Sequence, residues 1–240
     1  MLSRGSFLPI QNHRNAYLWA EFCLLFIGVP MLRYLHVFSF SPMQMIWGAS
    51  GLCAILLLRD RNFEFSRFWR VGQWRKQLPW TALRFAAVAS VLAVCSLMLI
   101  DKTGHSNIQG HSPFVFTLFF YPFLSVYPQG IIYRGFFFHR YQSLFPDRRL
   151  LIFASAMVFG YGHIIFDEPA TVGLTVAGGL FFARTYSTTG SLIFSGIEHA
   201  LYGNLIFAIG MWKYFFHSLQ QEVRQDSSLD CARSFASNPS

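Results

Sequence analysis

The chain has 240 residues and a net charge of +8, with 53% hydrophobic and only 12% charged residues. A soluble domain averages about 25% charged residues, so this composition excludes a disordered chain and most soluble folds. Since a membrane helix needs about 20 apolar residues, the length fits an all-α membrane bundle of seven to eight transmembrane helices.

Seven apolar segments are the predicted membrane spans. They cover residues 17–39, 42–58, 80–100, 113–143, 149–166, 169–186 and 190–212. The fourth is too long for one straight helix. We expect Pro122 and Pro128 to break it, with a helix starting at about Phe123, because proline removes a helical hydrogen bond. The whole chain, 1–240, is interpreted as one membrane-embedded domain with a polar tail over 217–240.

Basic residues gather between these segments. The loop over 59–84 carries seven arginines and lysines against two acidic residues. Positively charged loops stay in the cytoplasm, which predicts a cytoplasmic N-terminus and places the basic cluster at 140–149 on the same side. Anionic lipid headgroups, and not nucleic acid, are the expected partners of this charge.

A few polar side chains lie deep within the predicted spans, where they usually face a cavity or a partner. They are Glu21, Gln129, Arg134, His139, His163, Glu198, His199 and Asn204. The helical rise of about 1.5 Å per residue puts Gln129, His163 and His199 at similar depths. His199 shares a helix face with Gly196 and Gly203, a small-residue stripe that indicates close packing. We therefore expect the three side chains to meet in one polar pocket.

The residues by themselves leave the chemistry of that pocket open. Two imidazoles can bind a metal, activate a water molecule or simply hold structural hydrogen bonds. The four cysteines form no CxxC pair, and the sequence has neither an HExxH zinc motif nor a GxGD pair. No metal or other cofactor is therefore predicted.

The late segments resemble the CPBP family, which includes the CAAX prenyl endopeptidases and many bacterial Abi-type membrane proteins. The resemblance covers about residues 113–212. It rests on Arg134 within Ile131-Ile132-Tyr133-Arg134-Gly135-Phe136, on Phe159-x-x-x-His163 and on His199-Ala200-Leu201-Tyr202, in the same order. It implies an integral protein of the plasma (inner) membrane of a bacterium and a membrane-associated peptide or protein substrate.

In that family a Glu-Glu-x-x-x-Arg motif and a histidine activate the water that attacks a peptide carbonyl. A His-x-x-x-Asn/Asp motif is thought to hold the oxyanion. By position, the two glutamates fall on Gln129 and Gly130, and the arginine on Arg134. The histidines fall on His163 and His199, and the family's Asn position falls on Gly203.

The first motif is therefore degenerate. Gln129 can orient a water molecule but is not a useful base, because an amide is neutral. Gly130 removes the carboxylate one turn before Arg134. Asn204 is displaced by one residue from the family's position and is expected to point away from His199.

Arg134 then needs an anion, because a buried unpaired arginine is costly. The carboxylates available to it are Glu198 and Glu21. Our hypothesis is that Glu198 faces the pocket and either pairs with Arg134 or replaces the lost base. The alternative is that Glu198 only makes hydrogen bonds within the bundle.

Two functions of different classes remain, and the prediction leans toward the first. One is an intramembrane endopeptidase in which His163 helps to activate water and His199, with Asn204, stabilises the oxyanion. The other is an inactive relative that serves as a membrane scaffold, immunity or partner-binding protein, which the pair Gln129/Gly130 favours. A transporter is a weaker reading, because no half-to-half repeat is visible.

Overall fold

The computed structural model describes residues 8–71, 74–103 and 118–209. Within these ranges the chain is helical and has no β-strand. The first half contains α1 (Leu8–Cys23), a π-helical turn η1 (Leu24–Gly28), α2 (Val29–Tyr34), α3 (Pro42–Arg59), α4 (Ser66–Trp69) and α5 (Trp74–Thr103). The second half contains η2 (Pro122–Val126), α7 (Tyr127–Gly130), η3 (Ile131–Phe136), α8 (Phe137–Tyr141), α9 (Arg148–Tyr161), η4 (Gly162–Phe166), α10 (Pro169–Thr189) and α11 (Leu192–Ala208).

Four of these helical stretches are long and apolar enough to cross a membrane. They are His13–Tyr34, Pro42–Arg59, Arg75–Cys95 and Arg148–Phe166, and α11 is a shorter apolar helix. The chain is thus an all-helical integral membrane protein, whereas the count of seven to eight spans stays a prediction. The predicted polar tail and the start of the fourth predicted span lie outside the described residues.

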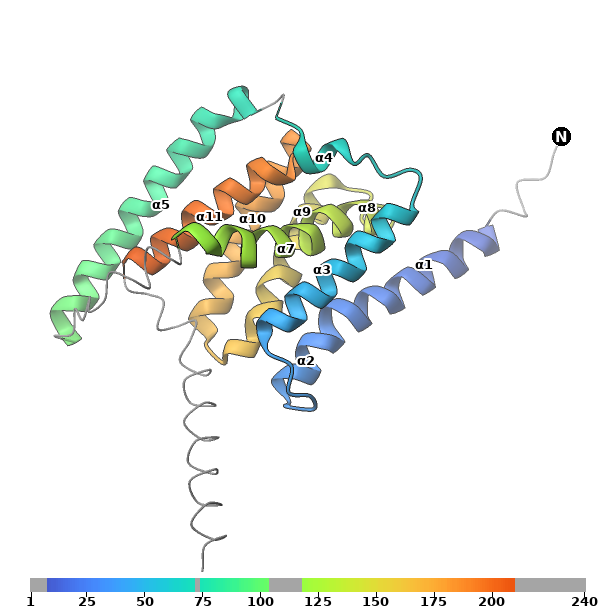
Figure 1. Cartoon of the computed structure of the whole chain (residues 1–240), viewed down its shortest axis with the longest axis horizontal. Coiled ribbons are helices and arrows are strands. Elements are labelled where there is room, and N and C mark those ends of the chain that lie inside the picture. Colours follow the sequence, from blue (N-terminus) through green and yellow to red (C-terminus); the bar gives the residue numbers. More distant parts are fainter. Residues whose placement is uncertain (1–7, 72–73, 104–117, 210–240) are drawn as a thin grey trace, which may run out of the picture.

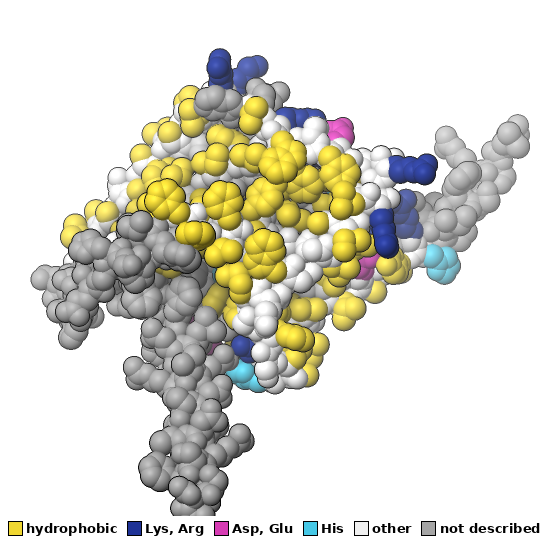
Figure 2. Space-filling view, viewed as in Figure 1, with side chains coloured by type: hydrophobic (Ala, Val, Ile, Leu, Met, Phe, Trp, Pro, Cys, Tyr) yellow, Lys and Arg dark blue, Asp and Glu magenta, His cyan; other side chains and the backbone are white. Residues whose placement is uncertain are grey.

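Two groups of helices lie on opposite sides of the central helices. In Figure 1, α5 runs beside α11 on one side, while α1 and α3 lie on the other side of the central helices. Hydrophobic side chains cover much of the face in Figure 2, and Lys and Arg side chains lie toward its edge. This distribution fits an apolar belt in the membrane with basic residues at the headgroups.

The segment around the two prolines differs from the prediction. Residues 118–141 are helical throughout, so the break expected at Pro122 and Pro128 does not occur. The N–H of Tyr127 donates to the carbonyl of Pro122, five residues earlier, which makes this turn π-helical. A π turn inserts one extra residue and gives the proline ring room without ending the helix.

One end of the bundle collects charged contacts between helices. Arg140 forms a bidentate pair with Glu21 at 2.7 and 2.9 Å, and His139 Nε2 lies 2.8 Å from Asp60 Oδ2. The hydrogen bond from His139 lowers the pKa of the Asp60 carboxyl below its usual range. The loop after α3 and the end of α8 therefore lie together, as expected if both basic clusters face the same membrane surface.

Close packing of α9 against α10 depends on small residues. A Cβ added at Gly160 would collide with Val176 Cγ2 and would lie 3.1 Å from the carbonyl oxygen of Val172. A Cβ at Gly179 would lie 3.0 Å from Phe159 Cδ1. Small residues at such crossings let two membrane helices approach closely, and here they set the position of the helix that carries His163.

We therefore expect Gly160→Ala to lower the free energy of unfolding by about 1–3 kcal/mol, because the added methyl group overpacks the crossing. The matched control is Gly173→Ala on α10, where an added Cβ meets nothing within 4 Å. The control should be neutral or slightly stabilising, since alanine favours a helix over glycine. Unfolding of the purified proteins in detergent measures both, and equal stability of the two variants would contradict this account of the packing.

Candidate active site

A large cavity lies among the membrane helices. Its volume is about 1230 Å³, and most of its lining is apolar, with residues from α3, α5, α10, α11 and the helix over 118–136. The polar side chains that also line it include Tyr121, Gln129, His163 and His199, which come from separate elements. An apolar cavity with a few convergent polar groups is the usual form of a binding or catalytic site.

His163 lies where α9 tightens into the 3₁₀ turn η4. Its Nδ1 is 2.8 Å from the backbone oxygen of Phe159, one turn earlier. A carbonyl oxygen only accepts, so Nδ1 carries the proton. The Nε2 atom of the neutral ring is then left with a lone pair that can accept a proton.

His199 has the opposite arrangement. Its Nδ1 is 3.5 Å from Nη2 of Arg134, and its Nε2 is 3.4 Å from the hydroxyl of Tyr121. Arginine only donates, so Nδ1 must accept and Nε2 must carry the proton. The ring stacks on Phe182 with centroids 4.4 Å apart, which fixes its plane. One imidazole of the cavity is thus an acceptor and the other a donor.

The two imidazoles lie close together. Both contact the ring of Phe159, with centroid distances of 4.9 Å for His163 and 5.4 Å for His199. Because both imidazoles contact the same phenyl ring, the distance between them is at most the sum of these two distances, which is about the diameter of one helix, roughly 10–12 Å. His199 is 5% exposed, so the inward orientation predicted from its glycine neighbours is confirmed.

Gln129 reaches the same cavity from α7. Its Nε2 donates to Oγ of Ser125 at 2.7 Å, and its Oε1 is buried without a hydrogen-bond partner in the described part of the chain. A buried acceptor without a partner costs about 1–3 kcal/mol. The amide oxygen is therefore an unused acceptor on a side chain that lines the cavity.

Arg134 lies behind His199 and does not line the cavity. It is 2% exposed, and its Nη2 is 3.4 Å from the carbonyl oxygen of Val126. A Cβ at Gly130 would lie only 2.8 Å from that nitrogen, so the missing carboxylate position is filled by the guanidinium itself. No carboxylate within the described ranges is hydrogen-bonded to Arg134.

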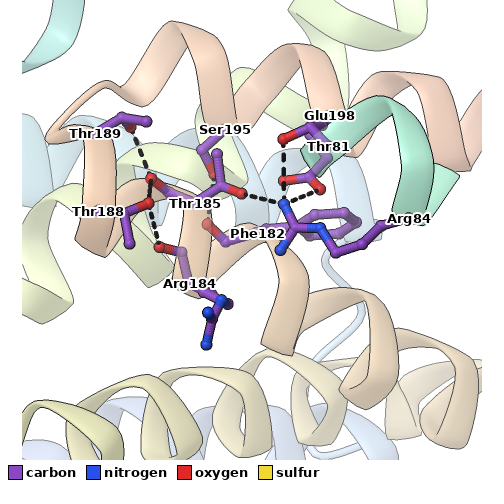
Figure 3. Close-up of polar contacts among 9 residues, drawn as sticks. All are labelled: Thr81, Arg84, Phe182, Arg184, Thr185, Thr188, Thr189, Ser195 and Glu198. Carbon is purple, nitrogen blue, oxygen red and sulfur yellow. Dashed lines mark hydrogen bonds and ion pairs between the residues drawn. The ribbon is translucent and has the colours of Figure 1, made fainter. Parts of the chain in front are cut away.

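Glu198 pairs with a residue that the sequence analysis did not consider as its partner. Its Oε1 accepts from Nη2 of Arg84 on α5 at 3.0 Å, and the expected pair with Arg134 does not form. Figure 3 shows the same guanidinium nitrogen directed at Thr185 on α10, at 3.0 Å, and at Thr81, at 3.1 Å. Consecutive helical residues point about 100° apart, so when His199 faces the cavity Glu198 faces α5.

The sequence did contain a signal for Arg84. This residue lies four positions inside the span predicted at 80–100, and a cation there needs a partner as much as Glu198 does. Its interpretation as part of the basic loop hid that signal. The other carboxylate considered for Arg134, Glu21, is held by Arg140.

In the CPBP family an asparagine lies one helical turn after the histidine that corresponds to His199. In this chain another side chain occupies that space. Asn204 does not line the cavity, and its Oδ1 is buried without a partner among the described residues. A Cβ at Gly203 would lie 2.5 Å from the hydroxyl oxygen of Tyr121 and 2.7 Å from its Cζ. The Tyr121 ring therefore occupies this space, and the sequence analysis missed it.

We searched the part of the chain that the structure describes for side chains that could bind a metal together. No group of three His, Cys, Asp or Glu side chains gathers there as a metal site would require.

Comparison with known proteins supports the resemblance seen in the motifs. Residues 110–205 match the Rce1-like family, described as type II CAAX prenyl endopeptidase Rce1-like. The matched segment holds Gln129, Arg134, His163 and His199, and it confirms the recognition of the CPBP family there. Neither the comparison with curated proteins nor that with solved structures gave a match.

Proposed function

We propose that this chain, whose residues 110–205 belong to the CPBP family, is an intramembrane endopeptidase that uses activated water. One observation carries the proposal. The hydrogen-bond partners of His163 and His199 assign opposite tautomers to two imidazoles that line one cavity. Hydrolysis of an amide can use such a pair, because water must lose a proton while the carbonyl oxygen gains negative charge.

The reaction divides among three side chains. Water is held by the free amide oxygen of Gln129 and gives a proton to Nε2 of His163 as its oxygen attacks the peptide carbonyl. The N–H at Nε2 of His199 donates to the oxyanion of the tetrahedral intermediate. As the C–N bond breaks, His163 returns the proton to the leaving amine, so that both the proton and the ring are restored.

Arg134 and Glu198 act outside the reacting atoms. Arg134 is a positioning residue, since it fixes the tautomer of His199 through Nδ1. Glu198 holds α5 through Arg84 and has no part in proton transfer. Asn204, which the sequence offered as a second oxyanion group, is left out because it does not line the cavity.

The substrate class follows from the cavity. A wall of apolar side chains in the membrane favours a peptide that is itself membrane-associated, such as the end of another membrane protein. The family's name points to prenylated CAAX ends, and the proposal does not require that lipid. We also propose that the protein lies in the plasma membrane of a bacterium, with a cytoplasmic N-terminus and the seven to eight membrane spans expected from the sequence.

Replacement of His163 by alanine tests the proposal. We expect cleavage of an internally quenched, lipid-anchored peptide by the purified protein in liposomes to fall by roughly 10²–10⁴-fold, because the proton acceptor is lost. The matched control is His139→Ala, whose ring pairs with Asp60 outside the cavity. Equal rates for the native protein and His163→Ala would overturn the proposal.

A second function, that of an inactive relative that binds a membrane partner, is favoured by Gln129 and Gly130. In this case the native protein does not cleave the peptide, and cleavage appears only in Gln129→Glu. The same assay therefore separates the two functions, because the enzyme requires cleavage by the native chain that is lost in His163→Ala.

A further inference from the structure

Tyr121 is a polar group of the cavity that has no role in the proposed hydrolysis and lies beside His199. Its hydroxyl oxygen lies 3.4 Å from Nε2 of His199, and its ring meets the imidazole edge-on at a centroid distance of 6.2 Å. Phe207 packs against the other part of the ring, at 5.3 Å. The phenol is therefore held from two positions on α11 beside the donor nitrogen of the site.

A glycine makes this position possible. Gly203 lies one helical turn after His199, and any side chain there would overlap the Tyr121 ring, whose Cζ would be 2.7 Å from an added Cβ. The ring thus lies directly on the backbone of α11. Such an approach aims its hydroxyl at the same side of the helix as His199.

The direction of the phenolic proton follows from the hydrogen-bond chain. Arg134 donates to Nδ1 of His199, so the proton of this imidazole is on Nε2. The phenolic oxygen therefore accepts from Nε2 in the resting site. Its own O–H is then left to donate to another acceptor, and Tyr121 lines the cavity.

Two other phenols line the cavity, and neither has this relation to an imidazole. Tyr133 packs on Phe159 with its hydroxyl against Gly162, and the hydroxyl of Tyr202 has no hydrogen-bond partner within the described ranges. Tyr121 alone among the three is hydrogen-bonded to a histidine of the site. This contact identifies it as part of the reacting group.

We propose that the hydroxyl of Tyr121 is the second donor to the oxyanion, beside the N–H of His199. The assignment rests on the proposed hydrolysis. When the carbonyl oxygen of the substrate becomes negative, it accepts from both groups, and the weak resting contact between them is replaced by two charge-assisted hydrogen bonds. No proton is transferred from Tyr121, so the reaction remains balanced as written above.

The test measures kcat and KM for peptide cleavage with and without Tyr121→Phe. The substitution is made both in the native sequence and in the Gln129→Glu variant. Tyr121→Phe removes one oxygen atom and keeps the ring that packs on Gly203. Loss of one oxyanion donor is expected to lower kcat by about 10²–10³-fold with little change in KM. The control is Tyr141→Phe, which loses a buried hydroxyl and its hydrogen bond to Glu21 at 2.9 Å, outside the cavity.

A second variant moves the same hydroxyl without removing it. Gly203→Ala displaces the Tyr121 ring and is expected to lower kcat as Tyr121→Phe does, while thermal unfolding in detergent shows whether the protein is folded. Unchanged kcat in Tyr121→Phe, in protein that does cleave the peptide, overturns this assignment and leaves the proposed function intact. Absence of cleavage by both the native protein and Gln129→Glu overturns the proposed hydrolysis, and the assignment with it.

Discussion

Replacement of Gln129 by glutamate is expected to increase kcat for peptide cleavage, because it adds a carboxylate base beside His163; the gain should stay below the roughly 10²–10⁴-fold that a general base contributes where none is present. Gln129 lines a cavity that His163 also lines, and its buried amide oxygen has no partner among the described residues. A carboxylate there can take the proton of the attacking water itself, and Ser125 can donate its hydroxyl to the new anion. The cleavage assay in liposomes measures the gain.

A matched substitution separates charge from size. Gln129→Leu has a similar volume but neither orients nor deprotonates water, so its rate should fall below that of the native protein. If the enzyme account is correct, the order of rates is Glu, Gln, Leu at position 129. A Gln129→Glu protein that is folded and cleaves no faster than Gln129→Leu would remove Gln129 from the water site.

The largest expected effect on stability comes from Arg84→Met. Glu198 has a completely buried side chain, and Arg84, which is 21% exposed, is its ion-pair partner at 3.0 Å. Removal of one partner of a buried pair leaves an uncompensated charge and typically costs about 3–5 kcal/mol. We expect a loss of this size in the free energy of unfolding, measured by denaturation in detergent.

The double variant Arg84→Met/Glu198→Leu gives the decisive comparison. It removes both charges, so most of the lost stability should return, because a buried pair replaced by apolar residues is often close to neutral. The control is Arg70→Met in the exposed pair with Glu64, which should change little because solvent screens that pair. A double variant as unstable as Arg84→Met would show that the charge on Glu198 is not what destabilises the single variant.

The Arg84–Glu198 pair also explains why the lost base was not replaced. Glu198 precedes His199 on α11, the two side chains point about 100° apart, and only His199 lines the cavity. The carboxylate meets Arg84 on α5, whose guanidinium also donates to Thr185 on α10. In the proposed hydrolysis, His163 is therefore the proton acceptor of the native chain.

The amino-acid sequence determined the membrane character, the approximate helices and three of the polar residues that line the cavity, Gln129, His163 and His199. Long apolar runs specify helices in lipid because each helix satisfies its own backbone hydrogen bonds, whatever its neighbours are. The segments predicted at 42–58, 149–166 and 169–186 agree with helical stretches at 42–59, 148–166 and 169–189. The glycine stripe likewise indicated the inward face of His199, because side-chain periodicity is a local property.

The tertiary structure alone decided which partner each polar side chain meets. Glu198 pairs with a residue 114 positions away, and Tyr121 reaches a histidine 78 positions away. Helical periodicity gives the direction of a side chain but not the identity of the neighbouring helix, nor the extra residue of a π turn such as that at Pro122. The tautomers of His163 and His199 depend on those contacts, so the division of donor and acceptor roles in the cavity appears only once the helices are packed.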